Sequence, residues 1–231
     1  MRRSKLYKSQ VSTLEASARY TIKEALDVLK AMPAVKFDQT VEAAFRLGID
    51  PRKSDQNVRG AVALPSGTGK SVRVAVVCDG PQADAAKEAG ADFVGYEDLV
   101  EQIKNGWQDF DILIATPNAM KLVRPLGRQL GPRGLMPNPK TGTVTDDVAP
   151  AVKEAKAGRV EFRADKGGCV HVPFGKLSFS AEALEANLRV IIDALVKARP
   201  SSTKGAYMLG CTISATMTPG VKLNAKELSG E

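Results

Sequence analysis

The apolar positions of the chain change their period along its length. Residues 22–32 carry apolar side chains at helical spacing, behind a Thr-x-x-Glu capping box that begins at Thr21, and Pro33 ends the predicted helix. From Phe37 the period becomes two, which predicts a strand whose inward face is formed by Val41, Ala43, Phe45 and Leu47. Residues 58–64 form the next predicted strand.

Strands and helices alternate through the middle of the chain. Residues 72–78 and 112–115 are continuous apolar runs, as in strands covered on both faces. Around them the pattern predicts helices and one short strand, namely helices over 83–89 and 97–105, a strand at 92–94, a helix from Asn118 and a last helix that ends at Gly158. This alternation implies a parallel, doubly wound sheet.

Alternation with a period of two returns after residue 158. Residues 160–164 and 170–172 are predicted to form a hairpin around Gly167 and Gly168, and a long helix begins after Ser180. A strand over 207–217 follows, with Tyr207, Leu209, Cys211, Ile213, Ala215 and Met217 expected on its apolar face. The other face is small and hydroxyl-bearing. It suits contact with RNA sugars or phosphates, although a plain solvated strand face is the alternative.

Size and charge predict two domains. Either outer stretch alone would make a marginal core, so residues 1–67 and 159–231 are expected to form one discontinuous α+β domain. Residues 68–158 would be inserted as a Rossmann-like α/β domain. The outer segments carry 22 basic and 14 acidic residues and the insert 11 and 12, so the net charge of +7 comes from the outer domain. That domain is the first candidate to bind a polyanion.

Composition excludes several classes of protein. The 231 residues are 43% hydrophobic and 26% charged, which are globular values. No apolar run approaches ~18 residues and no secretory signal is recognisable, so we expect no membrane association. Three cysteines without metal or redox spacing, and a single histidine, argue against a zinc site and for reduced thiols in a cytoplasmic protein. We therefore expect no metal and no cofactor.

The segment Ser66–Ser71 resembles a phosphate-binding loop. Leu64 occupies the position where that motif requires its first glycine, and a strand follows where the motif requires a helix. We therefore interpret the segment as a flexible crossing, with a nucleotide-binding enzyme as the weaker alternative. Glycines at both crossings, Gly67, Gly69 and Gly158, predict a hinge between the domains.

Two further features are candidates for RNA contact. His171 lies on a strand, either as a solvated residue or facing RNA, and no nucleophile motif accompanies it, so we expect no catalytic residue. Residues 112–145 contain five basic residues and no acid. Glycine and proline within 127–140 predict a fixed loop there, either structural or presenting Arg128, Arg133 and Lys140 to phosphates.

This loop leads to a resemblance. The segment from Leu126 to Val148 closely resembles the signature loop of the L1 family of ribosomal proteins, which belong to the mobile stalk of the large subunit. Other matching segments run from end to end of the chain, at residues 36–42, 47–60, 88–92, 158–166 and 216–217.

The resemblance implies a fold and a function. The fold is a split β-α-β domain built from both termini, with an inserted doubly wound domain. The function is non-enzymatic: a protein, monomeric outside the ribosome, that binds a stalk of large-subunit ribosomal RNA, mainly by its terminal domain, in cytoplasmic ribosomes. It also implies a part in releasing deacylated transfer RNA from the exit site, and repression of its own messenger RNA in bacterial members. A cytosolic regulator of messenger RNA acting off the ribosome is the alternative.

By position in the family's motifs, the expected RNA-binding residues are Lys36, Phe37, Thr40, Glu42, Arg163, Lys166, His171, Ser214, Thr216 and Met217. The chain departs from the family once. Where the family usually reads Thr-Met-Gly, this chain has Thr218 as the third residue. Threonine does not adopt positive φ as cheaply as glycine, so we expect an altered turn there.

Overall fold

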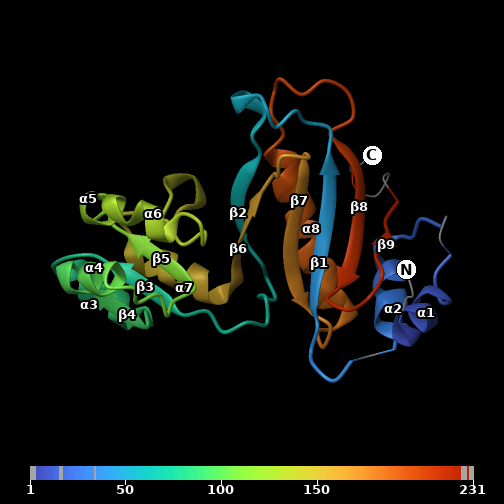
Figure 1. Cartoon of the computed structure of the whole chain (residues 1–231), viewed down its shortest axis with the longest axis horizontal. Helices are drawn as coiled ribbons and strands as arrows, with labels where there is room; N and C mark the ends of the chain where they lie inside the picture. Colours follow the sequence, from blue (N-terminus) through green and yellow to red (C-terminus); the bar gives the residue numbers. More distant parts are fainter. Residues whose placement is uncertain (1–3, 16–17, 34, 225–227, 229–231) are drawn as a thin grey trace. The chain divides into compact units, whose positions relative to one another are not determined.

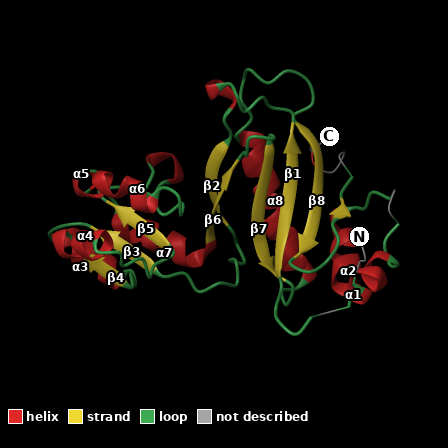
Figure 2. Ribbon diagram, in the orientation of Figure 1, coloured by secondary structure: helices red, strands yellow, loops and turns green. Residues whose placement is uncertain are grey.

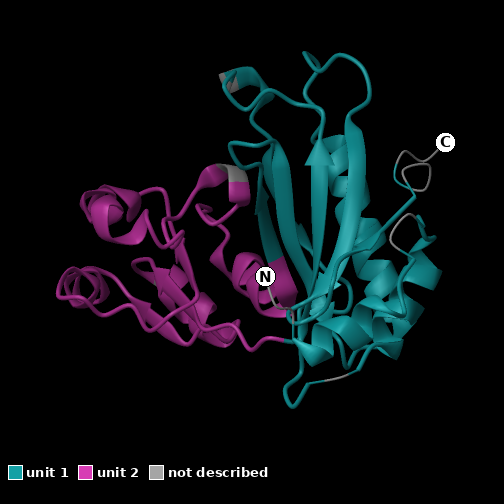
Figure 3. Ribbon diagram, turned by 45° about the vertical axis from the view of Figure 1, so that its right-hand side comes forward, with its two compact units in different colours: residues 1–69, 160–231 teal, residues 70–159 magenta. Residues whose placement is uncertain are grey.

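The structure is a computed structural model that describes residues 4–15, 18–33, 35–224 and 228. It divides into two units, residues 1–69 with 160–231 (unit 1) and residues 70–159 (unit 2), coloured separately in Figure 3. The sequence analysis placed the corresponding boundaries at 67/68 and 158/159. The predicted fold class, a two-domain α/β protein with parallel and antiparallel sheets, is confirmed.

Unit 1 is built on a four-stranded antiparallel sheet in the order β7-β1-β8-β9 (Figures 1 and 2). Its strands are β1 (Thr40–Leu47), β7 (Cys169–Lys176), β8 (Met208–Ala215) and β9 (Val221–Lys222). The central strand β1 comes from the N-terminal segment, while the other three come from the C-terminal segment. The sheet therefore joins distant parts of the chain.

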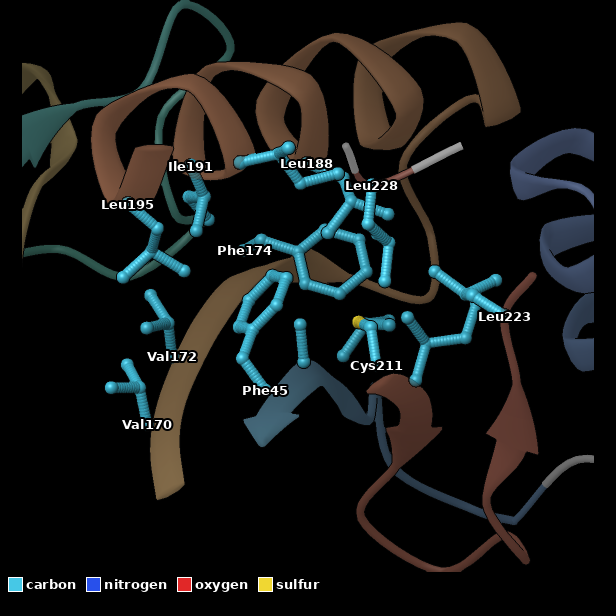
Figure 4. Packing of buried hydrophobic residues seen from close by; sticks show 14 of the residues in the cluster. Phe45, Val170, Val172, Phe174, Leu188, Ile191, Leu195, Cys211, Leu223 and Leu228 are labelled. Atoms are coloured by element: carbon cyan, nitrogen blue, oxygen red, sulfur yellow. The ribbon is translucent and has the colours of Figure 1, made fainter. Parts of the chain in front are cut away.

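One face of this sheet is covered by helices. The residues predicted to face inward from β1 are all buried. They pack with residues of β7 and helix α8 (Ala181–Lys197), as Figure 4 shows for Phe45, Val170, Val172, Phe174, Leu188, Ile191 and Leu195. Helix α2 (Ile22–Ala31) adds its apolar face to the same core. The other face of the sheet carries half-buried and exposed residues.

Both core helices begin at the predicted caps. The Thr21 side chain accepts from the Glu24 amide, and the Glu24 carboxylate accepts from the Thr21 amide, which completes the capping box. The Ser180 hydroxyl accepts from the Ala183 amide at the start of α8. A short helix α1 (Lys5–Val11) precedes α2 in the described chain.

The predicted hairpin over residues 160–172 forms only next to its turn, where Ala164 bridges Val170 and the Asp165 amide donates to the Cys169 carbonyl. Strand β6 (Arg159–Arg163) pairs with β2 (Arg59–Ala63) in a separate two-stranded sheet, and only a bridge between Ala164 and Val170 links it to β7. A Cβ at Gly60 would lie 2.7 Å from the ring of Phe162, so glycine there lets the ring pack across the pair. The turn η1 (Ser54–Gln56) precedes β2.

The predicted apolar face of β8 is wrong at Leu209, whereas Tyr207 is buried as expected. Leu47 pairs with Met208 and Arg46 with Gly210, so Leu209 is the extra residue of a β-bulge. Leu209 is consequently 47% exposed, and Met208 packs against the core instead. From Cys211 to Ala215 the predicted alternation holds, but Met217, which was also expected on the apolar face, is 51% exposed.

Unit 2 contains a parallel three-stranded sheet in the order β4-β3-β5. The strands are β3 (Val74–Val77), β4 (Phe93–Gly95) and β5 (Ile112–Ala115). The helices are α3 (Pro81–Glu88), α4 (Glu97–Lys104), α5 (Met120–Val123), η2 (Arg124–Leu126), α6 (Gly127–Leu130), η3 (Pro139–Thr141) and α7 (Val148–Gly158). All four β3 residues are buried, as expected for a strand covered on both faces.

The expectation that residues 127–140 contain no helix is wrong. Residues 127–130 form one helical turn, α6, and 139–141 form another, η3. Gly127 adopts right-handed helical angles, and Leu130 is fully buried in the core of unit 2, so burial overrides the low propensity of glycine. No helix among the described residues is long and apolar enough to cross a membrane.

Candidate RNA-binding face

The strongest candidate site lies at one end of the large sheet of unit 1. The Thr40 amide donates to the Thr216 hydroxyl (3.2 Å), and the Thr216 amide donates to the Thr40 carbonyl (3.1 Å). The Met217 amide donates to Oε1 of Gln39 (2.8 Å), whose side chain is buried. These bonds fix the start of β1 against the residues that follow β8.

Strand β7 holds the same segment from its other side. The Lys176 ammonium donates to the Thr40 hydroxyl (3.0 Å), and the Leu177 amide donates to the Gln39 carbonyl (2.8 Å). The Asp38 carboxylate accepts from the amide (3.2 Å) and the hydroxyl (2.8 Å) of Ser178. Residues 38–40 therefore have a fixed backbone between two strands, which we call the clamped end of the sheet.

Exposed apolar side chains stand on this clamped end. Phe37 is 52% exposed and Met217 is 51% exposed, and the segments that carry them are joined by the bond between Met217 and Gln39. Lys36 is exposed beside Phe37. A rigid surface that combines a ring, a thioether and a cation suits packing against RNA bases and sugars next to a phosphate.

The open face of the sheet continues this surface. Glu42 lies between Ser214 of β8 and Pro173 of β7, and the next outward position, Ala44, lies opposite His171. Glu42 and His171 are exposed and Ser214 is half-buried. Eight of the ten predicted residues thus lie on one surface. This surface begins at the clamped end, which carries Lys36 and Met217, and continues along the open face of the sheet.

The remaining two predicted residues lie near His171, at the other end of β1 from the clamped end. Arg163 ends β6, in the two-stranded sheet. Lys166 is exposed in the turn before β7, where the Gly168 carbonyl accepts from Leu47 at the opposite end of β1. Asp165 closes this turn, and its hydrogen bonds from the Cys169 and Gly167 amides lower the pKa of its carboxyl group. Arg163 and His171 flank the bridge between Ala164 and Val170, so Arg163 and Lys166 border the open face near His171.

Sequence reasoning missed the residues that build the clamped end, which are Asp38, Gln39, Lys176 and Ser178. They act through hydrogen bonds between segments more than a hundred residues apart. Only the match of residues 36–42 to a family motif singled out this region, and it gave no partner for any of them.

The unusual Thr218 is accommodated without positive φ. Its hydroxyl accepts from the Ala215 amide (2.8 Å), and its own amide donates to the Ala215 carbonyl (3.0 Å). No described residue other than glycine has positive φ. A hydroxyl-closed turn therefore follows β8, and Met217 stands at its tip.

The basic residues of the predicted second contact belong to unit 2. Arg128 is exposed in α6, Arg133 is exposed in the turn that follows, and Lys140 lies in η3. In the described part of the chain, neither arginine forms an ion pair.

The glycines predicted as hinge residues all adopt positive φ: 67° at Gly67, 70° at Gly69 and 105° at Gly158. The Gly67 carbonyl accepts from Nδ2 of Asn187 (3.0 Å), whose Oδ1 accepts from the Ser66 amide (3.1 Å). This segment continues into β3 rather than into a helix, and the Lys70 ammonium contacts Asp111 (2.6 Å). These features do not match a phosphate-binding loop.

The cysteines and acidic residues show no metal chemistry. Among the described residues, no group of three or more His, Cys, Asp or Glu side chains is placed to hold an ion. Cys78 and Cys211 are buried and unpaired, and burial raises the pKa of the Cys211 thiol to about 12. That thiol is therefore neutral and unreactive at physiological pH.

Comparison with known proteins agrees with this fold, in which both ends of the chain build one α/β unit and the middle builds another. The model of the ribosomal protein L1p/L10e family matches residues 29–219. Three relatives carry the name large ribosomal subunit protein uL1. The first, from Saccharophagus degradans, is 57% identical over 228 residues, covering 99% of this chain and 97% of the relative. The second, from Mannheimia succiniciproducens, is 57% identical over 227 residues, covering 98% of each. The third, from Teredinibacter turnerae, is 59% identical over 209 residues, covering 90% of each.

The chain therefore belongs to the ribosomal protein L1p/L10e family and is of its bacterial type. The resemblance stated from the sequence is confirmed, and so is the cytoplasmic, ribosomal location that it implied.

Proposed function

We propose that this chain is a structural protein of the large ribosomal subunit that binds large-subunit ribosomal RNA through unit 1. The observation that carries the proposal is the clamped end of the sheet, where Phe37 and Met217 are exposed on a backbone fixed from two sides. A folded protein normally buries such side chains, and an exposed pair on a rigid support marks a binding surface.

Charge supports the assignment to unit 1. Residues 1–69 and 160–231 contain 21 basic and 14 acidic residues, whereas residues 70–159 contain 12 of each. The entire net charge of +7 thus belongs to unit 1. Basic groups that neutralise phosphates give binding its strength and its salt dependence.

The open face of the sheet carries groups that can distinguish RNA from DNA. Thr212, Ser214 and Thr216 present hydroxyls on or beside β8, and small side chains there let a sugar–phosphate backbone approach closely. Hydroxyls of this kind bond to 2′-hydroxyls, which distinguish RNA from DNA. His171 and Glu42 border this strip and would orient the same backbone.

The finer role rests on what the family resemblance implies. We propose that the RNA is the stalk beside the exit site and that the protein assists the release of deacylated transfer RNA. Arg128, Arg133 and Lys140 would form a second RNA contact on unit 2. The chain's own messenger RNA would compete for the clamped end, because a face that reads shape accepts any RNA of similar shape.

Two measurements test this function. Cosedimentation of the chain with large subunits, lost in high salt, is expected of a ribosomal protein, whereas a regulator acting off the ribosome would remain in the supernatant. Binding of a stalk RNA fragment should be retained by a chain that joins residues 1–69 to 160–231 through a short glycine linker. Tighter binding by residues 70–159 alone would contradict the assignment to unit 1.

A further inference from the structure

Unit 2 contains a groove that RNA binding by unit 1 does not use. Its volume is about 470 Å³, and it lies between α4 on one side and α5, η2 and α6 on the other. This volume is in the range of ~300–1,000 Å³ that is usual for ligand sites. All of its lining residues belong to unit 2.

The floor of the groove is apolar. Val100 of α4 faces Leu122, Pro125 and Leu126 of the opposite wall. Helix α4 turns the face bearing Glu97, Val100, Glu101 and Lys104 to the groove, while its other face buries Leu99 and Ile103 in the core. The groove-facing side of α4 is therefore mostly charged, with Val100 as its one apolar residue, and the opposite wall supplies the other apolar residues of the groove.

The two walls carry opposite charge. Glu97, Glu101 and Lys104 line the α4 wall, with a net charge of −1, and Arg128 and Gln129 line the α6 wall, with a net charge of +1. This follows from a division of unit 2, because residues 79–111 hold nine acids and two bases whereas residues 112–145 hold five bases and no acid. The groove lies where these two parts meet.

We propose that this groove binds an amphipathic helix of a partner protein, with a basic flank toward Glu97 and Glu101 and an acidic flank toward Arg128. Charge complementarity identifies the occupant. A polyanion would gain from Arg128 and Lys104 but be repelled by both carboxylates, whereas a helix with a sign on each flank satisfies both walls, as in paired coiled-coil flanks. A bound helix would occupy Arg128, so it would exclude that residue from the second RNA contact proposed for unit 2.

The length of the groove fits a helix of two turns. The α4 residues that line it span seven positions, or ~10 Å at 1.5 Å per residue. A partner helix would place apolar residues at i, i+3, i+4 and i+7 over this length, the usual anchor spacing of helix-in-groove binding.

A designed peptide pair tests the proposal on the full-length chain. The first probe is a stapled helix with leucines at i, i+3, i+4 and i+7, lysines on one flank and glutamates on the other. The second is the same peptide with its four leucines replaced by serines. The charged residues of one flank are also replaced by serines. We expect the first peptide to shift the methyl resonances of Val100, Leu122 and Leu126 and the second to leave them unchanged.

Charge reversal gives a matched control. Glu101→Lys should weaken binding of the first peptide by about threefold to tenfold, since one favourable pair becomes a repulsion. Glu88→Lys makes the same change on the exposed face of α3, outside the groove, and should leave binding within about twofold. Thermal unfolding of both variants confirms that unit 2 remains folded.

Three results would overturn the proposal: no methyl shift with the first peptide, equal weakening by the two substitutions, or shifts of the same methyls by oligouridine but not by the peptide. The last would make the groove a site for single-stranded RNA. None of these results depends on whether unit 1 binds ribosomal RNA.

Discussion

Met217 stands out among the residues of the candidate face because alternation along β8 places it with the core. The strand ends at Ala215, and the turn closed by Thr218 carries Met217 outward until it is 51% exposed. Met217→Ala is therefore expected to weaken binding of the stalk RNA about tenfold while lowering the melting temperature only slightly. Affinity measurements and thermal unfolding check this, and a large loss of stability without a binding defect would make Met217 a core residue.

Thr216 combines a structural and a binding role. Its hydroxyl accepts from the Thr40 amide, so Thr216→Ala should destabilise unit 1 by about 1 kcal/mol. The same change removes a group available to RNA and should weaken binding about tenfold to hundredfold. Thr216→Ser, which keeps the hydroxyl, is the control and should bind almost normally. Equal affinity for all three proteins would exclude a contact.

Single residues were predictable where their chemistry is local. The caps at Thr21 and Ser180 depend on neighbours three residues away, and both are present as expected. Leu209 was not predictable, because the bulge depends on the register between β8 and β1. Gln39 and Lys176 belong to the clamped end only through contacts with distant segments, which no local pattern reveals.

At the scale of elements, period and burial gave the strands and most helices but not their partners. Residues 160–164 alternate as predicted, yet residues 160–163 pair with β2, and only Ala164 bridges β7. Alternation shows which face of a strand is buried, but it does not show which strand pairs with it. The turn α6 was missed for a different reason: its stability comes from burying Leu130, which outweighs the two flanking glycines.

Helix α8 contains a fully buried asparagine that fixes one crossing between the units. Nδ2 of Asn187 donates to the carbonyls of Phe174 (2.8 Å) and Gly67 (3.0 Å), and its Oδ1 accepts from Ser66. Asn187→Ala leaves these groups unpaired and creates a cavity, so we expect unit 1 to lose ~2–4 kcal/mol.

The chain contains its own control for this measurement. Its only tryptophan, Trp107, lies in unit 2 against Phe93 and Phe110. Denaturant unfolding followed by Trp107 fluorescence should keep its midpoint in the Asn187→Ala variant, while circular dichroism should show an earlier transition for unit 1. Equal shifts in both signals would mean that the two units unfold together.

The stability of unit 2 should depend on pH because of the Asp111 carboxylate, which contacts residues at the start of this unit. Asp111 accepts from Lys70 and from the Arg73 amide, and these hydrogen bonds lower the pKa of its carboxyl group. Because the folded pKa lies below the unfolded value of ~3.9, the stabilisation is fully present above about pH 5 and is lost as the pH falls through the folded pKa.

Asp111→Asn should therefore reduce the stability of unit 2 at pH 7 by less than about 1 kcal/mol, since Lys70 is exposed and the pair is screened. The difference from the unmodified chain should shrink as the pH falls through the folded pKa of Asp111. Trp107 fluorescence measures both. A difference that persists unchanged in acid would show that the carboxylate charge is not the cause.

At the scale of the molecule, two crossings join the units, and each contains glycine with positive φ. Asn187 holds the first crossing at Gly67, and Asp111 contacts Lys70 beyond it. We expect these crossings to act as a hinge, and small-angle scattering of the free chain should require more than one arrangement of the units. A profile that fits one rigid arrangement, unchanged by RNA, would contradict it.

The charge partition was the large-scale feature that the sequence made visible. It makes the outer segments the first candidate to bind a polyanion, because the charge of a segment can be summed without knowledge of the fold. The grouping of Lys36, Glu42 and Thr216 on one surface was beyond such counting. It depends on β1 lying between β7 and β8, which only long-range pairing establishes.

That position of β1 also orders events in time during synthesis. The strand is made early, but its two neighbours follow only after roughly 120 further residues, which at ~5–20 residues per second is a delay of roughly 6–24 seconds. Unit 2 lies wholly within this interval and is complete before β7 exists. A nascent chain therefore carries a finished insert while β1 is still unpaired, and its clamped end cannot capture RNA until β8 has been made.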